Sequence, residues 1–160
     1  MHPEFIDTLR SFFSSHSTEN HQIELAYLFG SRGTGEGGPL SDYDIAVLYS
    51  KICTAEETYE LAHELAKLLM TDRVDLVVLN RAPIELRYSV IVTGTVIYEV
   101  NVLTRVEFEA HTLSCYGDYL PILRRQRNEI LEERSDETRI QRYRTALGKT
   151  QRLLEEIRSL

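Results

Sequence analysis

A Gly-Ser pair and two aspartates are the residues in this 160-residue chain whose types and spacing could do chemistry. Gly30 and Ser31 follow an apolar run, and Asp42 and Asp44 come after ten further residues, where a second apolar run starts. Glycine lets the backbone approach a ligand closely, and backbone N–H groups with a serine hydroxyl can hold phosphate oxygens. Two carboxylates two residues apart in a strand share one face and suit a hard cation such as Mg²⁺. The pattern therefore predicts a site for a nucleoside triphosphate and Mg²⁺.

Asp75 is a candidate for a third carboxylate, because it interrupts the otherwise apolar run 74–79. A lone buried carboxylate is costly unless it is paired or binds a metal. If this run is a strand beside Asp42 and Asp44, Asp75 completes a three-carboxylate site. Two alternatives stay open: Asp75 could lie solvated at the strand entrance, and Asp72 in the preceding turn could be the third carboxylate instead.

At these residues the chain resembles the nucleotidyltransferase superfamily that includes DNA polymerase beta. The superfamily pattern is Gly-Ser, a spacer and Asp-x-Asp, with a third carboxylate on a neighbouring strand. The ten-residue spacer is similar to that of the minimal nucleotidyltransferases, and the resemblance covers residues 23–100. It implies one set of residues for the triphosphate of ATP and one for Mg²⁺ and catalysis. These sets are Gly30, Ser31 and Arg32 for ATP, and Asp42, Asp44 and Asp75 for Mg²⁺ and catalysis.

The minimal nucleotidyltransferases are the MNT-domain proteins, many of which are antitoxins paired with HEPN-domain toxins. The resemblance thus implies transfer of AMP from ATP to a tyrosine of a cognate HEPN-type RNase toxin, which silences the toxin. Two alternatives remain. One is an antibiotic-type (aminoglycoside) nucleotidyltransferase, although such relatives usually carry a larger C-terminal substrate domain. The other is a non-catalytic antitoxin that masks its toxin by binding.

The elements that position these residues follow from hydrophobic periodicity and from capping and turn signals. Helical spacing predicts helices over 3–13, 54–70, 83–93 and 104–133. Apolar β-rich runs predict strands over 23–29, 42–49, 74–79 and 95–100, with a glycine-rich turn between the first two. With these elements, the resemblance implies the α+β fold class, a small mixed β-sheet with flanking helices and a C-terminal helical extension.

We expect residues 1–100 to form the nucleotidyltransferase core. Residues 101–160 are expected to form the C-terminal helical extension, packed on the core and on a partner. Gly117 and Pro121 are expected to bend the long helix or divide it in two. A further helix is expected over 139–160, from the apolar spacing of its sequence.

Charge and composition limit the other functions. The net charge is −7, and residues 1–100 hold 7 Lys/Arg against 15 Asp/Glu, so direct nucleic-acid binding is not expected. No apolar run is long enough for a transmembrane helix, and the N-terminus lacks the features of a signal peptide. We therefore expect a cytoplasmic protein without a membrane role. Cys53 and Cys115 are expected to be free thiols.

Overall fold

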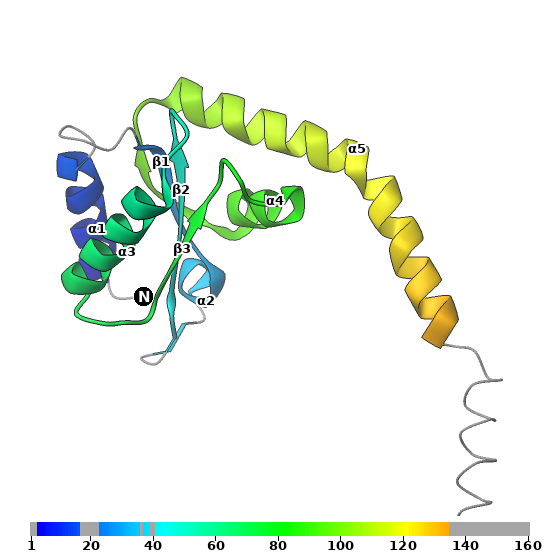
Figure 1. Ribbon diagram of the computed structural model, residues 1–160, viewed down its shortest axis with the longest axis horizontal. Coiled ribbons are helices and arrows are strands. Elements are labelled where there is room, and N and C mark those ends of the chain that lie inside the picture. Colours follow the sequence, from blue (N-terminus) through cyan, green and yellow to red (C-terminus); the bar gives the residue numbers. More distant parts are fainter. Residues whose placement is uncertain (1–2, 17–22, 36, 39–40, 135–160) are drawn as a thin grey trace, which may run out of the picture. The chain divides into compact units, whose positions relative to one another are not determined.

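The computed structural model describes residues 3–16, 23–35, 37–38 and 41–134. The chain divides into two compact units, residues 1–118 and 119–160, and each is considered by itself. Along the described chain the elements are α1 (Pro3–His16), β1 (Ile23–Phe29), α2 (Gly30–Thr34), β2 (Tyr43–Tyr49), α3 (Ala55–Leu68), β3 (Val74–Val78), α4 (Ile84–Thr93), β4 (Thr95–Glu99) and α5 (Val102–Arg134). Figure 1 shows them in these labels.

The four strands form one mixed sheet in the order β3-β2-β1-β4. β1 pairs antiparallel with β2 and with β4, whereas β2 and β3 are parallel. A parallel pair needs a crossover connection, and α3 provides it between β2 and β3. The predicted α+β class with a mixed sheet and flanking helices is confirmed.

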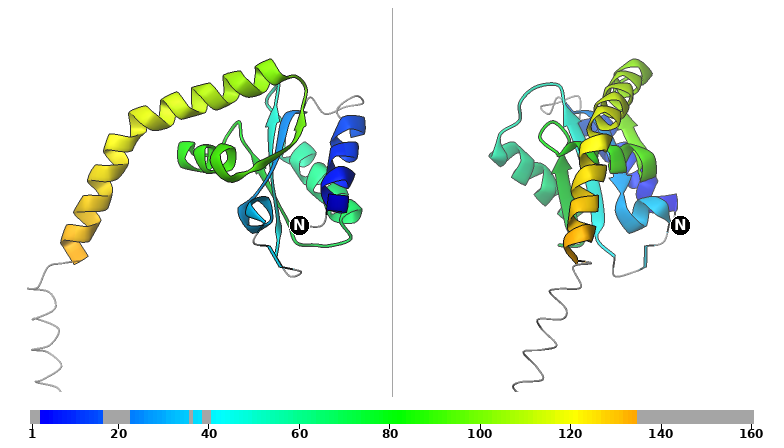
Figure 2. Two further views of the ribbon diagram at one scale, coloured as in Figure 1. Left: turned by 180° about the vertical axis from the view of Figure 1, so that it is seen from behind. Right: turned by 90° about the vertical axis from the view of Figure 1, so that its right-hand side faces the viewer.

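The two faces of the sheet are covered by different helices of the first unit (Figures 1 and 2). On one face, side chains of α1 and α3 such as Phe13 and Leu65 join the core with Ile45 and Val47 of β2. On the other face, Val90 of α4 packs with Tyr27 and other side chains of the sheet, and α2 lies beside the strand ends. We call this second surface the α4 face. It carries the candidate site.

The predicted elements are all present among the described residues, with small differences in their bounds and one added helix. The predicted turn after Phe29 begins with one short helix, α2, because the residues from Gly30 to Thr34 close a single helical turn. α1 runs on to His16, beyond the predicted end at residue 13, where the ring of His16 stacks on Phe12 at 4.7 Å between centroids. At the start of α3, Thr54 and Glu57 form a capping box, in which each side chain accepts a hydrogen bond from the backbone N–H of the other residue.

α5 is a single helix from Val102 to Arg134 with Pro121 inside it, so of the two predicted outcomes, a bend or a division in two, the division does not occur. A proline within a helix removes one backbone hydrogen bond, which a helix of this length can lose without ending. The boundary between the two compact units falls between Asp118 and Tyr119. The core boundary predicted at residue 100 stays a prediction, and the helix predicted over 139–160 lies outside the described residues. Among the described residues, no helix is long and apolar enough to cross a membrane.

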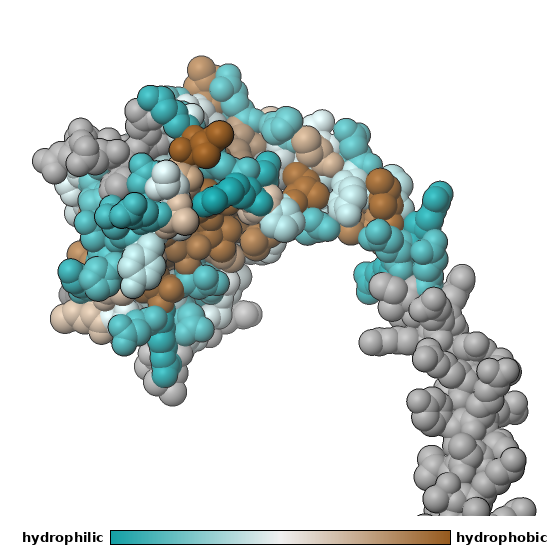
Figure 3. All heavy atoms as spheres, viewed as in Figure 1, coloured by the Kyte–Doolittle hydropathy of each residue, from teal (hydrophilic) through white to brown (hydrophobic). Residues whose placement is uncertain are grey.

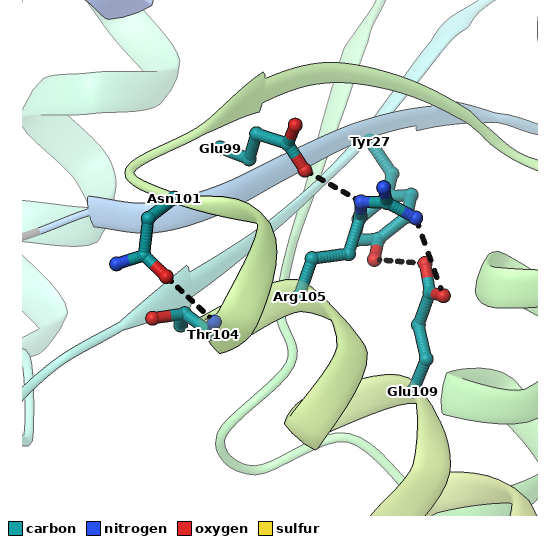
Figure 4. Close-up of polar contacts among 6 residues, drawn as sticks. All are labelled: Tyr27, Glu99, Asn101, Thr104, Arg105 and Glu109. Atoms are coloured by element: carbon teal, nitrogen blue, oxygen red, sulfur yellow. Dashed lines mark hydrogen bonds and ion pairs between the residues drawn. The ribbon is translucent and has the colours of Figure 1, made fainter.

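The start of α5 is held on the sheet by a group of polar side chains that we call the Arg105 cluster (Figure 4). Arg105 Nε donates to Glu99 Oε2 at 2.5 Å, and its Nη1 lies 3.5 Å from Glu109 Oε2. The buried hydroxyl of Tyr27 donates to Glu109 Oε1 at 3.0 Å. The cluster joins β1, β4 and α5, so the first turns of α5 are an integral part of the first unit.

Candidate active site

Gly30 and Asp44 occupy adjacent places at the end of the sheet. Gly30 directly follows Phe29, which is the register partner of Asp44 across the β1–β2 pair. Gly30 has φ of +63°, and a Cβ built on it would lie 2.0 Å from Asp44 Oδ2. Any other residue would suffer from that backbone conformation and would also displace the carboxylate. Glycine is therefore required at position 30, because a larger residue would occupy the space of the Asp44 carboxylate.

Asp44 and Asp75 are direct register partners across the parallel pair of β2 and β3. Neighbouring residues in register point to the same side of a sheet, so their carboxylates lie side by side. Phe29 and Ala46 place that side on the α4 face. Asp42 comes immediately before β2, which begins at Tyr43, so the prediction that both aspartates lie within the strand is wrong for Asp42.

Asp75 is solvent-exposed near the start of β3, which agrees with the alternative that it lies solvated at the strand entrance and not with a buried carboxylate. β3 lies at an edge of the sheet, where Asp75 is open to solvent on the α4 face. The apolar sequence around Asp75 reflects core packing by its neighbours, such as Leu76, toward α1 and α3. Its position beside Asp44 nevertheless agrees with the prediction that its strand neighbours the strand of the Asp-x-Asp motif.

The electrostatics of Asp44 show that these three carboxylates act on one another. Burial raises the pKa of Asp44, and the negative charges of Asp75 and Asp42 raise that pKa further. Asp72, in the bend before β3, is not among the groups that raise it. We call Asp42, Asp44 and Asp75 the carboxylate cluster.

The carboxylate cluster has the donor chemistry of a Mg²⁺ site. Among the described residues none forms a salt bridge with these carboxylates, so their mutual repulsion is not offset by a protein cation. No three such side chains in the described part of the chain make a ready-made metal cage. Mg²⁺ seldom uses one, because it takes one or two carboxylates and completes its shell with substrate phosphates and water. The cluster therefore fits Mg²⁺ brought together with a nucleotide.

The three residues predicted to bind the triphosphate lie at the start of α2, next to the cluster. Ser31 is exposed there, and the first N–H groups of a helix have no intrahelical partner. Arg32 is engaged elsewhere: its Nε donates to Ser41 O at 2.9 Å, and its Cζ lies 3.9 Å from the centroid of the Tyr43 ring. The sequence analysis did not assign a role to Tyr43, although its position between Asp42 and Asp44 indicates that it lies next to the site.

A mixed sheet with carboxylates on adjacent strands, beside a Gly-Ser helix start, defines a nucleotidyltransferase domain. The model of the polymerase beta nucleotidyltransferase family matches residues 11–102, more than half of the chain. The chain belongs to this family. Among curated proteins, none is similar enough to count as a relative.

Solved structures extend the similarity beyond the family core. A toxin–antitoxin structure with AMP-PNP contains a chain that is 29% identical, with a TM-score of 0.64, and the match covers 80% of this chain and 96% of the other. A complex of the tri-AMPylated Shewanella oneidensis HEPN toxin with its MNT antitoxin gives 28% identity, a TM-score of 0.58 and coverage of 79% and 94%. The MntA–HepT toxin–antitoxin pair gives 28% identity, a TM-score of 0.59 and coverage of 79% and 95%.

Proposed function

We propose that this protein transfers AMP from ATP to a tyrosine hydroxyl of a cognate HEPN-type toxin, and so acts as its antitoxin. The observation that carries the proposal is the register pairing of Asp44 with Asp75, directly beside the glycine that makes room for Asp44. This arrangement supports a site in which the carboxylates lie beside the helix start formed by Gly30 and Ser31. The similarity to antitoxins of HEPN/MNT pairs supports the choice of acceptor.

In this reaction the acceptor hydroxyl oxygen attacks the α-phosphorus of ATP. A bond forms between these two atoms, and the bond from the α-phosphorus to the α–β bridging oxygen breaks. Pyrophosphate leaves with that electron pair, and the hydroxyl proton passes to a carboxylate oxygen of Asp75, which acts as general base. Gly30 and Ser31 hold the triphosphate through backbone N–H groups and the serine hydroxyl, so the α-phosphorus faces the carboxylate cluster.

The carboxylate cluster supplies the negative charge that a cation needs at this place. Asp42, Asp44 and Asp75 would hold Mg²⁺, which when bound neutralises phosphate charge and makes the attacking hydroxyl more acidic. Because Asp44 carries the raised pKa, its carboxylate has the most to gain from a bound cation.

The outer side of α5 supports the partner assignment. Leu103, Val106, Ala110 and Leu113 follow one another at helical three- and four-residue spacing, and all are exposed. Figure 3 shows brown apolar side chains recurring along α5 among teal ones. An apolar stripe of this spacing suits packing against a helix of another protein. We propose that this stripe, together with residues 139–160, docks the toxin.

A matched pair of variants tests the docking role. Leu113→Glu and Ser114→Glu add the same charge at adjacent exposed positions of α5. Leu113→Glu should weaken capture of the toxin by at least roughly tenfold, since it puts a charge into an apolar interface, while Ser114→Glu should change it little. Removal of residues 139–160 should likewise weaken toxin binding more than nucleotide binding. Equal capture by both point variants would remove the stripe from the interface.

The antibiotic-type alternative is less well supported. The chain covers 94–96% of the toxin–antitoxin chains that it matches, so the same fold and length serve that function in the relatives. The discriminating experiment offers radiolabelled ATP with Mg²⁺ to the protein in the presence of its toxin or of an aminoglycoside. Label on the toxin, at a tyrosine found by mass spectrometry, supports the proposal. Label on the small molecule alone, or on neither acceptor, would overturn it in favour of the antibiotic enzyme or the masking antitoxin.

A further inference from the structure

Among the described residues, the guanidinium group of Arg32 makes two contacts, and both are with residues that flank Asp42 in sequence. Its Nε donates to the backbone oxygen of Ser41 at 2.9 Å. Its guanidinium carbon lies 3.9 Å from the centroid of the Tyr43 ring, within the range of a cation–π interaction. A single side chain of α2 therefore contacts the residues immediately before and after Asp42.

The loop that leads to Asp42 is folded onto the same arginine. A Cβ built on Gly37 would lie 2.7 Å from Arg32 Cγ and 3.1 Å from Arg32 Cα, so the loop backbone packs directly on Arg32. Gly38 and Ser41 then hold each other: Gly38 N donates to Ser41 Oγ at 3.0 Å, and Ser41 N donates to Gly38 O at 3.1 Å. Ser41, whose carbonyl accepts from Arg32, is thus itself tied to Gly38 by two hydrogen bonds.

Tyr43 points away from the triphosphate side of the sheet. It belongs to the core between the sheet and α1, where its ring meets Phe5 edge-on at 5.7 Å between centroids. Side chains alternate along a strand, so Tyr43 and Asp44 lie on opposite faces. Arg32 consequently reaches past the start of β2 to bind a residue that cannot itself touch the nucleotide.

We propose that Arg32 is a positioning residue that fixes Asp42 and Asp44 through Ser41 and Tyr43, and is not a ligand of the triphosphate. The proposal rests on the proposed function of the site and deepens it. A guanidinium can donate a directed hydrogen bond from Nε and at the same time lay its planar face on a ring. A lysine ammonium has the same charge but cannot do both. Asp42 lies outside the strand and needs such an external hold.

The kinetic test compares Arg32→Lys, Arg32→Ala, Tyr43→Leu and Tyr43→Phe. Arg32→Lys and Arg32→Ala should both lower kcat by roughly 10- to 100-fold with little change in the KM for ATP, since small misplacement of a catalytic group has costs of this order. Tyr43→Leu should lower kcat by a similar factor, whereas Tyr43→Phe should stay near the wild-type kcat because it keeps the ring. The double variant Arg32→Ala with Tyr43→Leu should have the same kcat as either single variant, because both changes remove one contact. Wild-type kcat in Arg32→Lys with a raised KM for ATP in Arg32→Ala would overturn the proposal in favour of a phosphate ligand.

A binding arm keeps the test independent of catalysis and of the acceptor. The probe is α,β-methylene-ATP, whose α–β linkage the transfer reaction cannot break, titrated with and without Mg²⁺. Arg32→Ala should bind the analogue as wild type does without Mg²⁺ and should need at least roughly tenfold more Mg²⁺ for half-maximal effect. Ser31→Ala is the control, and it should weaken binding without Mg²⁺. Arg32→Ala behaving like Ser31→Ala would overturn the positioning role. A wild-type protein that binds the analogue but never transfers AMP would instead overturn the proposed function. The binding measurement would then still decide whether Arg32 is a positioning residue.

Discussion

Two groups of ionisable side chains lie on the α4 face of the sheet, toward opposite ends of β1. The Arg105 cluster sits near its beginning, where Glu99 is the register partner of Leu25. Its two carboxylates share one guanidinium, and one of them also accepts the Tyr27 hydroxyl. The carboxylate cluster lies at the other end, where Phe29 pairs with Asp44. There the charges of Asp75 and Asp42 raise the pKa of Asp44.

The two clusters differ in whether the protein itself neutralises their charges. The charges of the Arg105 cluster stabilise the fold, whereas those of the carboxylate cluster are available to a ligand. Partly buried charges are tolerated when partners of opposite sign and hydrogen bonds offset the loss of water. The Arg105 cluster meets that condition within the protein and joins α5 to the sheet. The carboxylate cluster does not meet it within the described residues, which is the behaviour of a functional site that gives up some stability. Substitutions in the two clusters should therefore have opposite consequences.

Asp44→Asn should give the largest effect on activity. It removes a charged ligand with almost no change in volume, so AMP transfer should fall by on the order of 10³-fold, a loss typical of groups that act directly on the transition state. The nucleotide-free protein should be as stable as wild type or more stable, because the substitution relieves repulsion from Asp75 and Asp42. Transfer rates and thermal melting with and without Mg²⁺ measure both. A lower melting temperature would give Asp44 a structural role.

Asp75→Ala should lower transfer by about 10²-fold or more, the scale of general-base removal. Asp72→Ala is the matched control, because Asp72 is also exposed and lies three residues earlier in the bend before β3. It should leave the rate near the wild-type value. Steady-state transfer by the two variants decides between them, and the reverse order of rates would move the third carboxylate into the bend.

Arg105→Ala should lower stability and leave the transfer site intact. The substitution removes the guanidinium that Glu99 and Glu109 share, so the two carboxylates are left without a cation. Arg10→Ala removes an exposed pair with Asp7, one of a class that contributes about 0–1 kcal/mol, and provides the control. The fall in melting temperature should be clearly larger for Arg105→Ala, with nucleotide affinity unchanged in both. Equal melting temperatures would mean that the Arg105 cluster does not stabilise the fold.

Tyr27→Phe should have the smallest effect, a loss of roughly 0.5–1.5 kcal/mol from the missing hydrogen bond to Glu109. Burial and the charge of Glu109 raise the pKa of Tyr27. A raised folded-state pKa means that the stabilisation is complete below the unfolded value of about 10 and is lost as pH rises above it. Denaturant unfolding at pH 8 and pH 11 should show a smaller alkaline loss for Tyr27→Phe than for wild type. Identical losses would place the alkaline sensitivity at another group.

Periodicity and capping signals were enough to predict the helices and the strands, because these are local properties of the sequence, whereas the mixed sheet followed from the family resemblance. α2 was missed because one helical turn is too short to show a period. The neighbouring strands of Asp44 and Asp75 were predicted through a family resemblance, but the exposure of Asp75 depends on β3 lying at the sheet edge. The contact of Tyr27 with Glu109 joins residues 82 positions apart, and no local pattern encodes it. The contact between Arg32 and Tyr43 was missed for a different reason. Arg32 lies next to the Gly-Ser motif, and that position suggested a contact with the triphosphate although its side chain contacts Ser41 and Tyr43.

Mass spectrometry of the toxin after incubation with this protein tests the central claim most directly. The reaction contains ATP and Mg²⁺, and parallel reactions replace ATP with α,β-methylene-ATP or wild-type protein with the Asp44→Asn variant. AMP-PNP is not a suitable blank, because its α–β bridging oxygen is intact and transfer can still occur. The account predicts AMP on a toxin tyrosine with wild-type protein and ATP, and unmodified toxin in both controls. Unmodified toxin in all reactions, with toxin still bound to this protein, would contradict it.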